Sequence, residues 1–216
     1  MSLQRLHCED RETWLKCRAL QGIGASEVAA IVGYSPWMTA SELWEIKTGR
    51  RKRKDVSDNE SVQRGANLES AIRDFFMALH GDEYQIEYHP YDILYQSERP
   101  HYFATLDGEL TDRKGRKGIL EVKTGSPTTR DAWSQWDNKV PNHYYCQILA
   151  QLLATDYDFA VLQAALWNRN GDITFKDAYY IERLYAEADL IWLVGEQDKF
   201  WHCVKTDTNP GARLVF

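Results

Sequence analysis

The chain has 216 residues, of which 44% are hydrophobic and 12% aromatic, so it can bury the core of one domain. No apolar run approaches the roughly 20 residues that cross a bilayer, and the charged first residues lack the apolar centre of a secretory signal. The net charge of −6 speaks against a broad nucleic-acid-binding surface, although the segment GRRKRK at 49–54 is strongly basic.

The four cysteines, Cys8, Cys17, Cys146 and Cys203, lie far apart in the sequence, and none belongs to a C-x-x-C pair. This spacing argues against zinc ribbons and iron–sulfur clusters. We expect reduced thiols. Together with the missing signal segment, they favour a cytoplasmic protein without membrane contact.

The first predicted elements are two short helices. Ser26 follows the glycines of GIGASEV and is expected to cap a helix that ends at Gly33. Thr39 and Glu42 have the spacing of a capping box, which predicts a second helix that ends before Gly49. The basic run and the polar DVSDNE after it are expected to form a mobile loop.

A longer helix is predicted over residues 61–81, where apolar residues recur at helical spacing. Glu69 borders the apolar stripe of this helix. Its simplest role is an ion pair with Arg73, four residues later.

Residues 102–110 and 118–124 predict a β-hairpin around a polar turn. Asp107 lies near the end of the first strand, and Glu121 and Lys123 share one face of the second. Because neighbouring strands are about 4.8 Å apart, the two carboxylates can converge.

Two adjacent carboxylates repel each other, and a hard divalent cation removes that penalty. A lysine beside them could orient an attacking water and stabilise negative charge on phosphorus. The alternative is a structural network of ion pairs on an exposed hairpin face.

The rest of the chain predicts a helix over 141–155, two strands around an Asn-Gly turn at 170–171, and an amphipathic helix or pair of helices over 182–204. This order indicates an α/β fold with a central mixed β-sheet flanked by helices. We expect a single domain over residues 1–216.

The motif formed by Asp107 and the run Glu121-Val122-Lys123 resembles the D…ExK core of the PD-(D/E)XK nuclease superfamily. The ordered set GIGASEV, RGANLES, ATLDGE, ILEVKT and YYCQILAQLLAT is similar to the YqaJ-like viral recombinase, or phage lambda exonuclease, family. The resemblance covers residues 18–155, roughly two thirds of the chain.

The resemblance implies a Mg²⁺-dependent exonuclease with a restriction-endonuclease-like core. It would digest one strand of linear double-stranded DNA in the 5′→3′ direction from a 5′-phosphorylated end, leaving a 3′ tail for strand annealing. Two Mg²⁺ ions are implied, with Mn²⁺ as a substitute. The resemblance also implies a homotrimeric ring, a single-strand annealing protein as partner, and a phage or prophage origin in a bacterial cytoplasm.

By position, the resemblance assigns metal binding to Asp107, Glu121, the carbonyl of Val122 and Glu69. It assigns the role of catalytic lysine to Lys123.

Gln147 matches a glutamine that helps to hold the active site, although Gln151 is close enough to leave this assignment open. The resemblance further implies four residues that bind the 5′-phosphate: Ser26, Arg18, Thr105 and Arg130. The two arginines match only after a shift of one residue. For the serine, a plain helix cap is the alternative role, although a hydroxyl at a helix N-terminus also suits an anion.

Two other functions stay open. The chain could be another PD-(D/E)XK DNA nuclease, such as an endonuclease or a RecB-like enzyme, with the same metal core. It could also be a non-catalytic DNA-end-binding recombination protein.

Overall fold

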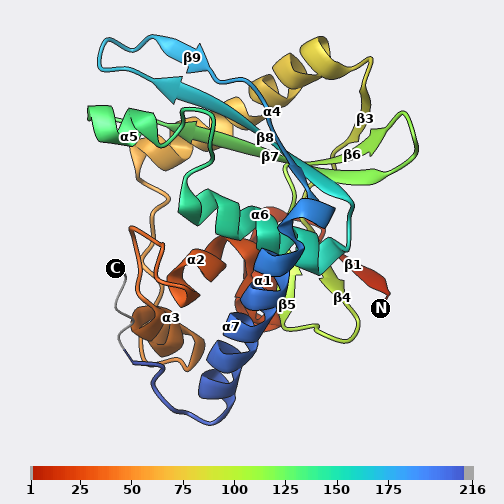
Figure 1. Ribbon diagram of the computed structural model, residues 1–216. Coiled ribbons are helices and arrows are strands. Elements are labelled where there is room, and N and C mark those ends of the chain that lie inside the picture. The colour runs from red at the N-terminus through yellow and green to blue at the C-terminus, as the bar shows by residue number, and fades with distance from the viewer. Residues whose placement is uncertain (1, 212–216) are drawn as a thin grey trace.

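A computed structural model of the chain describes residues 2–211 and distributes the strands over two sheets (Figure 1). The smaller sheet has the order β1-β4-β5-β2, with strands Leu3–His7, Asp92–Gln96, Tyr102–Ala104 and Ile23–Gly24. The larger sheet has the order β10-β8-β7-β6-β3, with strands Tyr179–Glu182, Phe159–Trp167, Lys117–Gly125, Gly108–Asp112 and Tyr84–Glu87. The short β9, Ile173–Phe175, also pairs with β8.

The larger sheet is mixed, because β7 and β8 run parallel while its other pairs are antiparallel. The helical segments are α1 Arg11–Gln21, η1 Ala25–Glu27, α2 Val28–Ile31, α3 Ala40–Lys47, α4 Glu60–His80, α5 Arg130–Ser134, α6 Asn142–Thr155, η2 Arg183–Ala186 and α7 Glu187–Lys205. The predicted α/β architecture with a flanked mixed sheet is therefore confirmed. Within residues 2–211, no helix combines the length and the apolar character needed to cross a bilayer.

Helices pack on both faces of the larger sheet because side chains alternate along β7. Leu120 and Val122 belong to the same buried cluster as Ile72 and Phe76 of α4. Ile119, with the opposite orientation, joins the cluster on the α6 side of the sheet.

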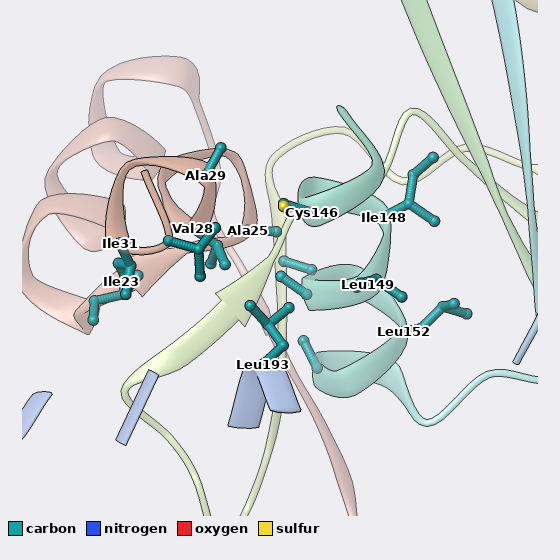
Figure 2. Packing of buried hydrophobic residues seen from close by; sticks show 14 of the residues in the cluster. Ile23, Ala25, Val28, Ala29, Ile31, Cys146, Ile148, Leu149, Leu152 and Leu193 are labelled. Atoms are coloured by element: carbon teal, nitrogen blue, oxygen red, sulfur yellow. The ribbon is translucent and has the colours of Figure 1, made fainter. Parts of the chain in front are cut away.

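The core on the α6 side is the larger of the two and also includes α2 and α7. Figure 2 shows Val28 and Ile31 of α2 together with Leu149 of α6 and Leu193 of α7. All four side chains are almost completely buried. This core fixes α6 against the sheet, and α6 carries both glutamines of the candidate site.

Several predicted elements are confirmed. The helix α3 begins after Thr39, whose hydroxyl accepts from the Glu42 N–H while the Glu42 carboxylate accepts from the Thr39 N–H, at 3.2 and 2.9 Å. The long helix, the glutamine-bearing helix and the last helix are also present, as α4, α6 and α7. The cysteines are free thiols.

The prediction of one continuous strand over 102–110 is wrong. The chain leaves the smaller sheet after Ala104 and enters the larger sheet at Gly108, so Thr105–Asp107 form a link between two sheets. The alternation of side chains does not reveal the break, because both halves are buried.

The predicted capping role of Ser26 is also wrong. The 3-10 turn begins at Ala25, so the cap position is Gly24, two residues earlier, whose N–H donates to the Glu27 carboxylate at 2.9 Å. The predicted strand after the Asn-Gly turn is likewise divided, into β9 and β10.

Candidate functional site

Two carboxylates meet where β6 begins beside β7. The antiparallel register pairs Gly108 with Leu120, which places Asp107, one residue before the strand, opposite Glu121. Glu121 is only 1% exposed. Burial and the neighbouring Glu121 raise the pKa of Asp107 well above its usual range, because both disfavour a second negative charge. The register thus brings the acidic side chains of Asp107 and Glu121 close together.

The Glu121 carboxylate accepts hydrogen bonds from two glutamines of α6. Gln147 Nε2 donates to Oε1 at 2.5 Å, and Gln151 Nε2 donates to Oε2. The residues lie four apart, so they project from the same helix face. Both candidate glutamines, Gln147 and Gln151, therefore contact the same carboxylate, one on each oxygen.

Lys123 completes this group. Its ammonium pairs with Oε1 of Glu121 and lies 5.0 Å from the ring centre of Tyr144. Burial opposes the charge, but Glu121 and Asp107 outweigh it and raise the pKa of Lys123 above its ordinary value. At neutral pH the side chain is a cation, suited to orient water and to stabilise a developing negative charge.

Glu69 reaches the same region from α4. Arg73 Nη1 donates to Glu69 Oε1 at 3.0 Å and to the backbone carbonyl of Asp107 at 2.7 Å. The predicted ion pair of Glu69 with Arg73 is confirmed, and it does not remove Glu69 from the site. The Glu69 charge contributes to the raised pKa of Asp107.

Among the residues that the structure describes, no three His, Cys, Asp or Glu side chains approach closely enough to form a ready-made metal-binding group. The Val122 N–H donates to Oδ2 of Asp107 at 2.8 Å, which fixes that carboxylate beside β7. The available donors are carboxylate and carbonyl oxygens, the ligands that Mg²⁺ and Mn²⁺ prefer. A divalent cation would also relieve the repulsion that raises the pKa of Asp107, so these residues suit such an ion chemically.

Arg18 lies near the acidic pair without a carboxylate of its own. Its guanidinium stacks on Trp14, 4.4 Å from the ring centre, and the described part of the chain offers it no ion pair. Burial lowers the pKa of Arg18 to about 10, Arg53 adds repulsion, and Asp107 partly offsets both. A half-buried cation without a counter-ion is suited to receive an anionic ligand.

Ser26 is exposed on η1, next to a buried group of charges. Its neighbour Glu27 pairs with Lys47 at 2.8 Å and with Arg53. Burial and the proximity of Arg18 lower the pKa of Lys47 to about 8. Sequence reasoning did not single out Glu27 or Lys47. The sequence feature that could have pointed to them is the basic run at 49–54, because its Arg53 pairs with Glu27.

The other two predicted phosphate-binding residues, Thr105 and Arg130, lie at different distances from the acidic pair. Thr105 is in the link between the sheets, and its carbonyl accepts from Gln151 at 3.4 Å. Arg130 is exposed at the first position of α5, and no described residue forms an ion pair with it. The structure therefore brings Thr105 to the acidic pair and leaves the Arg130 side chain unanchored.

Comparisons with known proteins identify a family and a shared fold. The YqaJ-like viral recombinase domain family matches residues 13–158. The protein YqaJ of Bacillus subtilis (strain 168) is 31% identical over 138 residues, which are 64% of this chain and 40% of that protein. The chain therefore spans less than half of that relative's length.

Solved structures share the fold. An alkaline exonuclease from Laribacter hongkongensis superposes with a TM-score of 0.67 at 18% identity, covering 91% of this chain and 94% of that one. The same exonuclease in complex with dAMP gives a TM-score of 0.62, with the same identity and coverage. A phage-related exonuclease from Haemophilus somnus 129PT gives 0.50 at 13% identity, covering 86% of this chain and 96% of that one. At these identities the likeness concerns the fold.

Proposed function

The chain belongs to the YqaJ-like viral recombinase family, and from this membership we propose that it is a metal-dependent DNA exonuclease. It digests one strand of linear double-stranded DNA in the 5′→3′ direction from a 5′-phosphorylated end, leaving a 3′ tail for strand annealing. The observation that carries the proposal is the convergence of Asp107, Glu121 and Lys123 at one point of the larger sheet. The exonuclease folds with which the chain superposes support it further.

In this proposal, Asp107, Glu121, the Val122 carbonyl and Glu69 would hold two Mg²⁺ ions, whose chemistry would be to activate water and to stabilise negative charge on the leaving oxygen. Gln147 and Gln151 keep the Glu121 carboxylate in place through its two oxygens. Lys123, held as a cation, donates to the attacking water and to the charge that develops on the phosphoryl oxygens.

The DNA end would be recognised through its 5′-phosphate. Arg18 is a half-buried cation without a carboxylate partner among the described residues, and Ser26 offers an exposed hydroxyl on the adjacent turn. Thr105 and Arg130 complete the proposed phosphate-binding group. We expect a terminal phosphate to bind Arg18 with a charge-assisted hydrogen bond, which sets how far the strand enters.

The assembly and the partner are proposals from family resemblance. A homotrimeric ring would enclose the duplex and line its channel with basic residues, so the net charge of −6 would not oppose DNA binding. A single-strand annealing protein would take up the exposed 3′ strand.

One experiment tests the function directly. Linear duplex carrying a 5′-phosphate, the same duplex with a 5′-hydroxyl, and a closed circle are incubated with the protein in Mg²⁺ or in chelator. Separate 5′ and 3′ labels report the direction. We expect Mg²⁺-dependent digestion of the linear DNA alone, faster with the phosphate, with the 5′ label released first.

The alternatives give different results. Cutting of the circle would favour an endonuclease, and release of the 3′ label first would reverse the proposed direction. Binding to ends with no cleavage in Mg²⁺ or Mn²⁺ would favour a non-catalytic end-binding protein.

A further inference from the structure

Trp37 is the most exposed tryptophan in the described part of the chain, with 72% of its surface accessible. It lies in the loop between α2 and α3. Hydrogen bonds fix this loop: the Tyr34 and Ser35 N–H groups donate to the Ala29 carbonyl at 2.9 and 3.0 Å, and the Trp37 N–H donates to the Ser35 hydroxyl at 3.2 Å. The indole is thus presented to solvent from an ordered turn.

The indole is supported from one side by the first turn of α6. Its ring centre lies 5.0 Å from that of His143 in a T-shaped contact and 6.5 Å from that of Tyr144. The His143 and Tyr144 rings are themselves 4.0 Å apart. Three aromatic rings therefore form one cluster, and only Trp37 is largely exposed.

This cluster adjoins the candidate catalytic lysine. The Lys123 ammonium lies 5.0 Å from the centre of the Tyr144 ring, so Tyr144 touches both Lys123 and Trp37. A DNA strand whose phosphodiester lies at Lys123 would pass its neighbouring nucleotide within reach of the indole.

Resting on the proposed nuclease function, we propose that Trp37 is a stacking platform for an unpaired DNA base next to the site of cleavage. A base stacked on the indole would remove aromatic surface from water on both partners, which favours binding. Stacking is available to every base, so a platform of this kind suits an enzyme that digests DNA regardless of sequence. The ordered loop and the supporting His143 hold the ring before DNA arrives, which reduces the entropy lost on binding.

The test measures DNA affinity in chelator, so that it does not depend on cleavage. The ligand is a fluorescent duplex with a short frayed end, followed by anisotropy at one fixed salt concentration. Since stacking contributes roughly 1–3 kcal/mol per base, we expect Trp37→Ala to weaken binding roughly 5- to 150-fold. Trp37→Phe keeps most of the affinity because it keeps an aromatic face.

Tyr185→Ala is the matched control, because Tyr185 is 88% exposed and lies in η2. Arg183 of η2 donates to the carbonyl of Leu152 near the C-terminal end of α6, about 14 Å along the helix from the turn that supports Trp37. This variant is expected to bind DNA like the wild type.

An abasic site moved along each strand identifies the stacked base. At one position, the abasic site should weaken binding by the wild-type protein as much as Trp37→Ala weakens binding of intact DNA. The same abasic site should not weaken binding by Trp37→Ala any further, as in a double-mutant cycle. Unchanged affinity of Trp37→Ala, or equal losses at every abasic position, would overturn the inference. So would Trp37→Ala binding DNA normally but losing an annealing protein.

Failure of the nuclease proposal looks different. If wild-type protein binds frayed duplex and Trp37→Ala does not, stacking stands even where Mg²⁺ produces no digestion. If wild-type protein digests DNA and Trp37→Ala binds it equally well, only the stacking inference falls.

Discussion

At the scale of single residues, the site depends on how Glu121 is held. Its carboxylate receives two glutamine side chains and the Lys123 ammonium, so a buried negative charge has partners on both oxygens. Among the described residues, the Asp107 carboxylate has only the Val122 N–H and an ammonium that it shares with Glu121. Because Asp107 has few partners, burial and Glu121 raise its pKa. A cation bound beside Asp107 would therefore stabilise its ionised form.

Lys123→Ala should lower the rate of DNA digestion roughly 10²- to 10⁴-fold, the range for loss of one acid–base or orienting group. Binding of duplex in chelator should change little, since the glutamines still hold Glu121, whereas the melting temperature in chelator should fall because the buried carboxylates lose their ammonium partner. Lys199→Ala, an exposed lysine of α7, is the control and should digest DNA normally. A wild-type rate in Lys123→Ala would remove the lysine from the mechanism.

Asp107→Asn should stabilise the metal-free protein at pH 8. Folding raises the pKa of Asp107, so its ionised form lowers the free energy of unfolding. This loss begins as pH rises past about 3.9, the usual value for Asp, and is complete above the folded pKa. Each kcal/mol regained raises the melting temperature by roughly 2–4 °C in a chain of this size.

The gain should shrink toward pH 4, where the wild-type carboxyl is also neutral. Mg²⁺ should then raise the melting temperature of the wild type and not of Asp107→Asn, which no longer digests DNA. A lower melting temperature for the variant at pH 8 in chelator would contradict this account.

At the scale of elements, the parallel pair β7 and β8 is the centre of the fold, and one glycine makes its close packing possible. A Cβ on Gly118 would lie 2.3 Å from the Phe159 ring, which is fully buried beside it. Gly118→Ala should therefore cost about 1–3 kcal/mol through overpacking, measured by urea unfolding.

Gly195 provides the opposite case within α7. A Cβ there meets no atom within 4 Å, and helical alanine is more stable than glycine. Gly195→Ala should raise the free energy of unfolding by roughly 0.5–1 kcal/mol. If both variants shifted stability in the same direction, the packing argument for Gly118 would not hold.

The sequence predicts the helices well and the strand ends less well, for a physical reason. Thr39 with Glu42 is a local cap, and its hydrogen bonds form as expected. The passage from β5 to β6 has no such marker, because which sheet a buried strand joins depends on distant partners: β5 pairs with β2 and β4, and β6 with β3 and β7.

The same distinction applies to the site. Asp107 directly precedes β6, and Glu121 and Lys123 lie on the neighbouring β7, so local spacing predicts their convergence. Lys47 and Trp37 reach the region from other parts of the chain, and no local pattern marks a tryptophan that tertiary contacts leave exposed.

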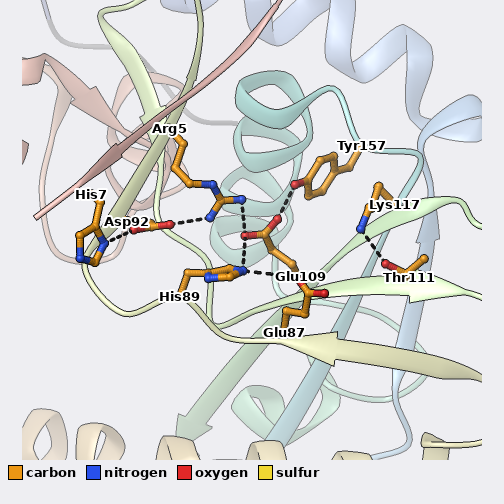
Figure 3. Close-up of polar contacts among 9 residues, drawn as sticks. All are labelled: Arg5, His7, Glu87, His89, Asp92, Glu109, Thr111, Lys117 and Tyr157. Atoms are coloured by element: carbon orange, nitrogen blue, oxygen red, sulfur yellow. Dashed lines mark hydrogen bonds and ion pairs between the residues drawn. The ribbon is translucent and has the colours of Figure 1, made fainter.

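At the scale of the whole molecule, a charged network joins the two sheets (Figure 3). Arg5 of β1 donates to Asp92 of β4 at 2.5 Å and to Glu109 of β6 at 2.7 Å, and Tyr157 donates to the other oxygen of Glu109 at 2.5 Å. Asp92 and Glu109 are buried, so each depends on these donors. The network lies two residues from Asp107 along the chain.

Arg5→Ala should lower the free energy of unfolding by about 1–3 kcal/mol, because it leaves buried carboxylates short of donors. The control is Arg113→Ala, whose exposed ion pair with Asp82 should contribute about 0–1 kcal/mol. Both are measured by chemical denaturation. Equal losses would show that the inter-sheet contact has no special role.

The link Thr105–Asp107 has a consequence for the length of the fragments that the protein would release. Arg18 and Ser26 flank β2 of the smaller sheet, whereas Asp107 and Glu121 belong with the larger one. The distance from the proposed phosphate-binding residues to the proposed cleavage site is then set by the angle at which the two sheets join. The fold would therefore set the length of the released fragment. A substitution that changed the angle between the sheets would change this length without altering any catalytic side chain.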